Sequence, residues 1–77
     1  MEVERTRRVK PEGLGQRIKQ ARQNDLRTMK ELCERANLTP THWYDIEKEN
    51  VKILPEETLR RIEAVLGIDF GVNFDDD

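Results

Sequence analysis

The side chains best suited to chemistry stand in one short stretch, and their types favour hydrogen bonding over catalysis. Thr41 can donate to or accept from the edge of a nucleic-acid base, and His42 can donate to guanine or to a phosphate. Tyr44 can reach a phosphate, whereas Asp45 accepts only from a donor such as cytosine N4 and repels phosphates. Lys48 adds a positive charge that suits a phosphate. If one helix face presents them together, we expect the first four at base edges and Lys48 at the backbone.

The elements that must position these side chains are two short helices joined by a break of three residues. The pattern Thr28-x-x-Glu31 is typical of a capping box, which predicts that a helix begins there. Asn37 follows the last apolar position of that helix, and asparagine tolerates the left-handed conformation needed at a turn. Thr39 as N-cap and Pro40 at the first helical position predict the start of a second helix. The segment therefore predicts a helix-turn-helix, which leaves one surface of its second helix free.

Two further helices are expected around this pair. Apolar residues recur on one face over residues 12–24, and a wide apolar stripe covers residues 55–66 before Gly67. The predicted fold class is all-α, a compact domain of four to five helices that contains a helix-turn-helix. The residues expected in its core are Leu14, Ile18, Leu32, Cys33, Trp43, Ile46, Leu59, Ile62 and Leu66.

The two ends of the chain are expected to lie outside the helical domain, residues 12–68. Residues 1–11 show little periodicity, and Pro11 disfavours helix at the residue before it. We expect a flexible basic arm, which either follows phosphates or a minor groove or is simply a solvated terminus. Residues 69–77 alternate apolar with polar or small residues before three aspartates, a pattern that suits a short extended piece or a hydrophobic hook.

The net charge of −2 hides an uneven distribution along the chain. Residues 1–35 hold ten Lys/Arg against six Asp/Glu, a net charge of +4, and residues 36–77 hold four against ten, a net charge of −6. The first half could therefore meet phosphates, although charge halves of this size occur in many helical proteins. The cations expected to contact phosphates are Arg5, Arg7, Arg8, Arg17, Lys19, Arg27, Lys30 and Lys48.

The composition argues against several classes of protein. One cysteine cannot form an internal disulfide, no apolar run could cross a membrane, and the amino terminus lacks the apolar segment of a signal peptide, so we expect a cytoplasmic protein. No paired carboxylates, metal-ligand cluster, glycine-rich phosphate loop or nucleophile–base arrangement stands out. We therefore expect no enzyme activity, no cofactor and no metal site.

Several short motifs stand in a recognisable order at consistent spacings. They are Leu14-x-x-x-Ile18-x-x-x-Arg22, Thr28-x-x-x-Leu32-Cys33, Asn37-Leu38-Thr39, Trp43-x-x-Ile46-Glu47, Pro55-x-x-Thr58-Leu59 and Leu66-Gly67. With these motifs the chain resembles the Cro/repressor-type helix-turn-helix family, also called the XRE family, from Leu14 to Ile68.

The resemblance implies a lambda-repressor-like fold that binds double-stranded DNA, with the second helix of the motif in the major groove. It implies a transcriptional regulator such as a repressor, which pairs as a homodimer. It also implies a salt bridge between Arg22 and Glu47 that fixes the motif and does not read bases. The chain departs from the family at Met29, where relatives commonly have glutamine, and at Pro40, which offers no side-chain hydrogen bond.

A second interpretation stays open, in which the same fold is a protein-interaction module without sequence-specific DNA reading. An antitoxin, a phage modulator or an adaptor would fit, and the overall acidity, Met29, Pro40 and the apolar tail favour it. The exposed apolar candidates for a dimer contact, some of which could instead fold back on the core, are Ile53, Leu54, Phe70, Val72 and Phe74.

Overall fold

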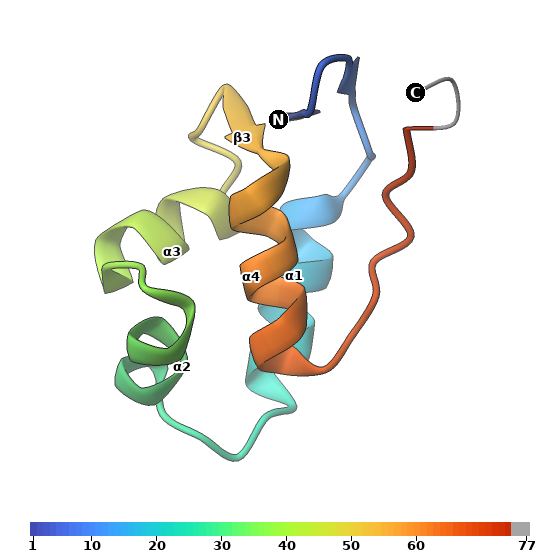
Figure 1. Cartoon of the computed structure of the whole chain (residues 1–77). Helices are drawn as coiled ribbons and strands as arrows, with labels where there is room; N and C mark the ends of the chain where they lie inside the picture. Colours follow the sequence, from blue (N-terminus) through green and yellow to red (C-terminus); the bar gives the residue numbers. More distant parts are fainter. Residues whose placement is uncertain (75–77) are drawn as a thin grey trace.

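The structure is a computed structural model that describes residues 1–74, and its main elements are four helices. They are α1 (Leu14–Gln23), α2 (Met29–Ala36), α3 (Pro40–Glu47) and α4 (Glu56–Leu66), as Figure 1 shows. The capping box forms as predicted, because the Thr28 hydroxyl accepts the Glu31 backbone N–H at 3.2 Å and the Glu31 carboxylate accepts from Thr28. At α3, the Thr39 side chain accepts the His42 N–H at 3.2 Å and Pro40 occupies the first turn. The starts of both helices are therefore set by local side chains.

The turn between α2 and α3 is short because Asn37 adopts the left-handed conformation, with φ 56° and ψ 47°. The Leu38 N–H then donates to the Cys33 carbonyl at 3.0 Å, which closes the end of α2. Two residues later Thr39 returns to an extended conformation and caps α3. The two helices therefore follow each other at a sharp angle, on the same side of the molecule in Figure 1.

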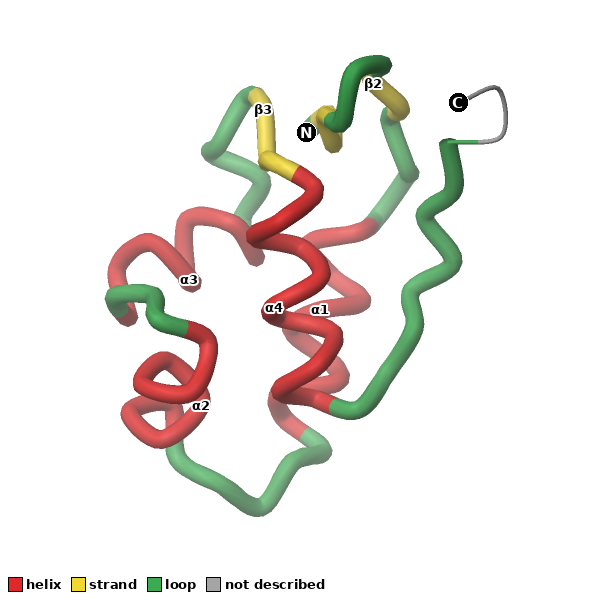
Figure 2. The backbone as a smooth tube through the Cα atoms, viewed as in Figure 1, coloured by secondary structure: helices red, strands yellow, loops and turns green. Residues whose placement is uncertain are grey.

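The expectation of an all-α fold is wrong, because a three-stranded mixed sheet packs beside the helices. Strand β1 (Glu2–Glu4) pairs antiparallel with β2 (Arg8–Val9) and parallel with β3 (Ile53–Pro55), in the order β2-β1-β3 (Figure 2). Val3 lies opposite both Val9 and Leu54 in this register. The fold is therefore α+β. Strands of two or three residues are too short to show an alternating pattern in the sequence.

The predicted flexible arm, residues 1–11, is instead a β-hairpin anchored by its own apolar residue. The Val3 side chain is fully buried, and the Arg5 N–H donates to the Arg7 carbonyl at 2.9 Å across the hairpin turn. The terminal amino group of Met1 binds Glu49 Oε1 at 3.1 Å. These contacts fix the hairpin against the loop that follows α3.

The core combines the predicted helical residues with others that the sequence did not single out. All residues expected in the core are buried except Leu66, which is partly buried. The buried apolar residues beyond that expectation are Val3, Ala36, Leu54, Phe70, Val72 and Phe74. The sheet and the segment after α4 therefore complete a core that the helices alone leave open.

The segment after α4 folds back over α1 and α4 as the hydrophobic hook that the sequence suggested. Gly67 ends α4 with φ 68°, and the alternating residues Phe70, Val72 and Phe74 then point into the core. The three aspartates at the end of the predicted tail, residues 75–77, lie outside the described residues.

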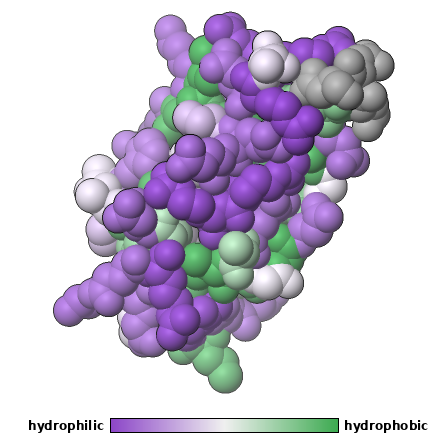
Figure 3. Space-filling view, in the orientation of Figure 1, coloured by the Kyte–Doolittle hydropathy of each residue, from purple (hydrophilic) through white to green (hydrophobic). Residues whose placement is uncertain are grey.

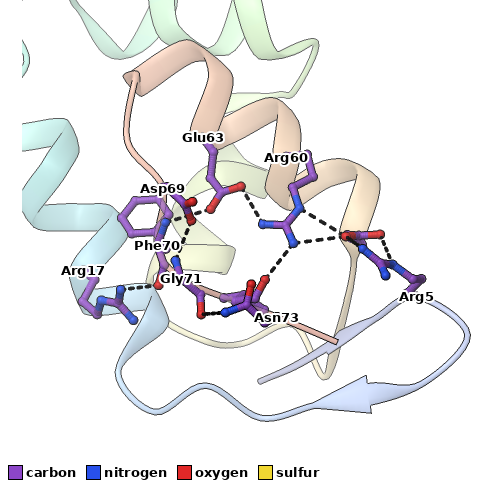
Figure 4. Close-up of polar contacts among 10 residues, drawn as sticks. Arg5, Arg17, Arg60, Glu63, Asp69, Phe70, Gly71 and Asn73 are labelled. Carbon is purple, nitrogen blue, oxygen red and sulfur yellow. Dashed lines mark hydrogen bonds and ion pairs between the residues drawn. The ribbon is translucent and has the colours of Figure 1, made fainter. Parts of the chain in front are cut away.

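Side chains of α1 and α4 bind the backbone of this hook (Figure 4). Glu63 accepts the Phe70 N–H at 2.8 Å, and Arg60 donates to the Val72 carbonyl at 2.7 Å. Arg17 donates to the Phe70 carbonyl. The face seen in Figure 3 is largely hydrophilic, with smaller apolar areas, as expected once these apolar side chains are buried.

Candidate nucleic-acid interface

The orientation of α3 is set by its buried side. Trp43 and Ile46 are fully buried, so the opposite side of the helix faces solvent. Three of the residues expected at base edges are exposed there, and the fourth, Asp45, is partly buried. The exposed three are Thr41, His42 and Tyr44. The helix therefore presents the predicted polar set on one surface.

A buried carboxylate fixes α3 against α1. Glu47 is 7% exposed, and it accepts hydrogen bonds from Arg22 Nε at 2.6 Å, from Arg22 Nη2 at 3.0 Å and from Trp43 Nε1 at 2.7 Å. The side-chain hydrogen bond to Glu47 raises the pKa of Arg22 above its ordinary value. Since the bidentate pair holds a planar guanidinium on one helix and a carboxylate on the other, it fixes their relative angle.

Two further features show how closely α1 and α3 approach each other. The Arg22 guanidinium carbon lies 5.4 Å from the centre of the Tyr44 ring. At Gly15, a side chain of even one carbon would lie 2.3 Å from the Glu47 carbonyl oxygen. The close approach of the two helices therefore requires glycine at this position.

The loop after α3 is fastened to α1 by Glu49, which has φ 56°. Its Oε2 accepts the Gly15 N–H at 3.0 Å, and its Oε1 binds the terminal amino group of Met1. Burial alone would raise the pKa of Glu49, but the hydrogen bonds from Gly15 and the amino group lower it. The carboxylate therefore stays charged and joins three segments.

Most of the arginines expected at phosphates are occupied within the fold. Arg5 pairs with Glu56 at 2.6 Å and Arg8 with Glu4 at 2.8 Å, both near the hairpin. The hydrogen bond from Arg5 is the main reason that the pKa of Glu56 falls to about 2. Arg17 binds the hook instead, and Arg7 lies exposed in the hairpin turn.

Arg27 is also occupied, since its Nη2 binds Asp25 Oδ2 at 2.8 Å and the Val65 carbonyl at 2.5 Å. Its hydrogen bonds lower the pKa of Asp25 to about 2. It therefore braces the loop between α1 and α2 against the last turn of α4. Because these contacts use its guanidinium, we assign Arg27 a structural role first and a phosphate contact only second.

Three of the predicted phosphate contacts are not used by the fold. Lys19, Lys30 and Lys48 are exposed, and none of them has an ion pair among residues 1–74. They lie on α1, in the first turn of α2 and directly after α3. Among the predicted phosphate contacts, these three lysines are therefore the cations that remain available for a ligand.

A hollow of about 440 Å³ lies between α1 and α3. Its lining residues are Gln16, Lys19, Arg22, Tyr44, Glu47 and Lys48. The Arg22–Glu47 pair was predicted from the resemblance, and Lys19, Tyr44 and Lys48 were predicted as DNA contacts, but no prediction brought the five together or pointed to Gln16. The spacing of Gln16 and Lys19, three apart on one helix, is the signal that could have joined them.

Two predicted core residues, Trp43 and Cys33, lie near the site. Trp43 is buried as predicted, and its indole N–H also donates to Glu47, a contact that the i,i+4 spacing of the two residues could have indicated. Cys33 is buried, and burial is the main reason that its pKa is raised, so the thiol stays protonated. It packs as a small apolar residue, with Sγ 3.4 Å from Met29 Sδ.

No family model matches the chain, and no curated protein or solved structure is detectably similar to it. Within residues 1–74, no three His, Cys, Asp or Glu side chains gather as they would around a metal ion. None of the four described helices has both the length and the apolar character needed to cross a membrane.

Proposed function

We propose that this protein is a sequence-specific, double-stranded DNA-binding transcriptional regulator in which α3 enters the major groove. The observation that carries the proposal is the exposed polar face of α3, on a helix fixed from behind by Trp43, Ile46 and Glu47. A recognition helix needs both properties, because its base contacts depend on a defined angle to the rest of the domain. The short turn between α2 and α3, from the C-cap Asn37 to the N-cap Thr39, supports the same interpretation.

The base readers proposed are Thr41, His42 and Asp45, together with Tyr44, whose hydroxyl can reach either a base edge or a neighbouring phosphate. Thr41 and His42 stand in the first turn of α3, the end of a recognition helix that reaches base edges. Asp45 adds selectivity of another kind, because a carboxylate accepts from cytosine N4 and is repelled elsewhere in the groove. The proposed contacts therefore favour a site with a cytosine opposite Asp45.

The phosphate contacts proposed are three of the lysines that have no ion pair within residues 1–74, Lys19, Lys30 and Lys48. If each of them neutralised a phosphate of its own, the slope of log K against log salt would be about −3 for each copy bound. This slope is modest, as expected for a chain whose net charge is −2.

We also propose that the protein binds DNA as a homodimer in the cytoplasm and acts as a repressor. One helix of eight residues reads only a few base pairs, so a second copy on a two-fold site extends the sequence read. Four of the apolar candidates for the dimer contact, Leu54, Phe70, Val72 and Phe74, are used in the core, and Ile53 is partly buried. Ile68, directly after α4, is 41% exposed and is the apolar side chain that we propose for pairing.

The test is selection of random duplexes by the purified protein at low salt. We expect an enriched two-fold motif, and we expect Thr41→Ala with His42→Ala to abolish the enrichment. Gln23→Ala, an exposed polar change at the far end of α1, is the matched control and should keep it. Binding no tighter than to random DNA would contradict the proposal.

The protein-interaction module is the second candidate, and one observation favours it. Leu26 is fully exposed in the loop before α2, and Arg27 binds that loop to the Val65 carbonyl at the end of α4, near exposed Ile68. An equimolar protein complex that Leu26→Ser abolishes, together with a blank DNA selection, would favour this function.

A further inference from the structure

We propose that the hollow between α1 and α3 is a phosphate-binding site, and that its ligand is one backbone phosphodiester of the bound duplex. The inference deepens the proposed function and rests on it, because the hollow adjoins the outward face of α3. Tyr44 and Lys48, which line the hollow, stand one turn apart at the carboxyl end of α3.

The first support is the charge of the lining. Lys19 comes from α1 and Lys48 from the end of α3, so two separate elements direct cations at one concavity. Both lysines are exposed, and neither is paired with a carboxylate within residues 1–74. The two lysine charges repel each other, and an anion bound between them adds two attractions that offset this repulsion.

The second support is the state of the one carboxylate in the lining. Glu47, which lines the hollow, already accepts two hydrogen bonds from Arg22 and one from the Trp43 indole, so its charge is neutralised within the fold. It is 7% exposed and therefore hardly competes for the lysines. With three cations and one carboxylate, the lining has a net formal charge of +2.

The third support is the set of neutral donors. Gln16 and Tyr44 line the same hollow, and the amide of the one and the hydroxyl of the other can donate to phosphate oxygens. The Tyr44 ring lies 5.4 Å from the Arg22 guanidinium carbon, which restricts where its hydroxyl can lie. A phosphate has several acceptor oxygens, so two cations and two neutral donors can bind it together.

A phosphate held here would set the position of α3 along the duplex. Thr41 precedes Tyr44 by three residues on the same helix, so a base reader and a phosphate contact lie on adjacent turns. Phosphate contacts fix the register of a protein on DNA, whereas base contacts supply the sequence information. The hollow is thus the site that aligns the base-reading residues.

The protein contains its own probe for this site. Trp43 is the only tryptophan of the chain, and its indole N–H donates to Glu47, which lines the hollow. A phosphate bound above Glu47 changes the electric field at the indole, so the fluorescence of Trp43 should change with occupancy. This readout does not depend on which molecule supplies the phosphate.

The experiment combines duplex binding at several salt concentrations with Trp43 fluorescence during titration of inorganic phosphate. The variants are Lys19→Gln, Lys48→Gln and the double change, with Lys10→Gln as a matched control outside the hollow. We expect each single change to weaken duplex binding, and the double change, which removes both lysines from the one phosphodiester, to flatten the salt slope by about 0.9. Lys10→Gln should leave the slope unchanged, and Tyr44→Phe, which keeps the ring but loses the hydroxyl, should weaken binding without flattening it.

The outcomes separate this inference from the proposed function. Duplex binding whose slope is the same in all variants would overturn the phosphate site and leave the DNA-binding function standing. Absence of duplex binding, with a saturable phosphate response of Trp43 that the double change removes, would overturn the function and keep a phosphate site for a free ligand. A blank result in both measurements would overturn both.

Discussion

Glu47 is the residue on which the orientation of α3 depends most directly, because its buried carboxylate collects three hydrogen bonds from two helices. We expect Glu47→Ala to lower the free energy of unfolding by about 3–5 kcal/mol, since it leaves the Arg22 guanidinium, with 18% of its side chain exposed, without its partner. Urea denaturation followed by circular dichroism measures the change.

The matched test is a double-mutant cycle with Arg22→Met and Glu47→Met. Because an apolar pair needs no counter-charge, the double variant should lose less stability than the two single changes added together, by about 1–3 kcal/mol. Additive losses would show that the pair does not act as a unit.

Gly15 offers a case in which two effects oppose each other. Alanine is favoured over glycine inside a helix by roughly 1 kcal/mol, but here its Cβ would lie 2.3 Å from a backbone oxygen of α3. Overpacking of this kind costs about 1–3 kcal/mol, so we expect Gly15→Ala to be destabilising overall, with a lower urea midpoint. Gln16→Ala, the exposed neighbour, is the control and should change stability little.

Residue types and spacing predicted which side of α3 faces solvent, but not what the arginines bind. Trp43 and Ile46 stand three apart on one helix, so their burial could be inferred locally. Arg5 binds Glu56 and Arg17 binds the Phe70 carbonyl, and both partners lie more than fifty residues along the chain. No local pattern specifies such a pair, so the sequence overstated the positive charge available for a ligand.

Among the elements, the hook after α4 contributes to the core without regular secondary structure. Phe70 is 5% exposed, and we expect Phe70→Ala to cost about 3 kcal/mol, because it removes a large buried ring. Thermal denaturation or urea denaturation measures the loss. Ile68→Ala, in the same segment but 41% exposed, should stay within about 0.5 kcal/mol of the parent protein. Equal losses would mean that the hook does not pack against the core in solution.

The helices were predictable because their signals are local, whereas the strands were not. Thr28 and Thr39 cap helices through backbone groups three residues away, so the sequence pattern contains the whole interaction. The parallel pairing of β1 with β3 depends on residues that stand far apart in the sequence, such as Glu2 and Ile53. The strand β3 pairs only with this distant partner, and a run of two or three residues contains no evidence of the pairing.

For the molecule as a whole, the paired carboxylates predict loss of stability in acid. The pKa of Glu56 and that of Asp25 both fall to about 2 in the folded protein, below their ordinary values of 4.5 and 3.8. The unfolded chain therefore binds more protons between these values, and stability that is fully present above about pH 4.5 is lost as the pH falls toward 2.

Urea denaturation at a series of pH values measures this dependence. Glu56→Gln should flatten the fall in stability between about pH 4.5 and 2, because it removes one of the carboxyl groups whose pKa is lowered in the folded protein. Glu12→Gln, an exposed acid for which no ion pair is found within residues 1–74, is the control and should keep the slope. A pH profile that Glu56→Gln leaves unchanged would contradict the assigned role of the Arg5 pair.

The mixed sheet also has a consequence for the order in which the chain folds. Pairing Glu2 with Ile53 closes a loop that contains α1, α2 and α3, and closing a long loop costs chain entropy before any contact repays it. The short contacts within α2, its turn and α3 carry little of this cost. We therefore expect the helical pair to assemble early and the hairpin to dock late, so that a newly made chain would form its α2–α3 unit before its first residues find their place.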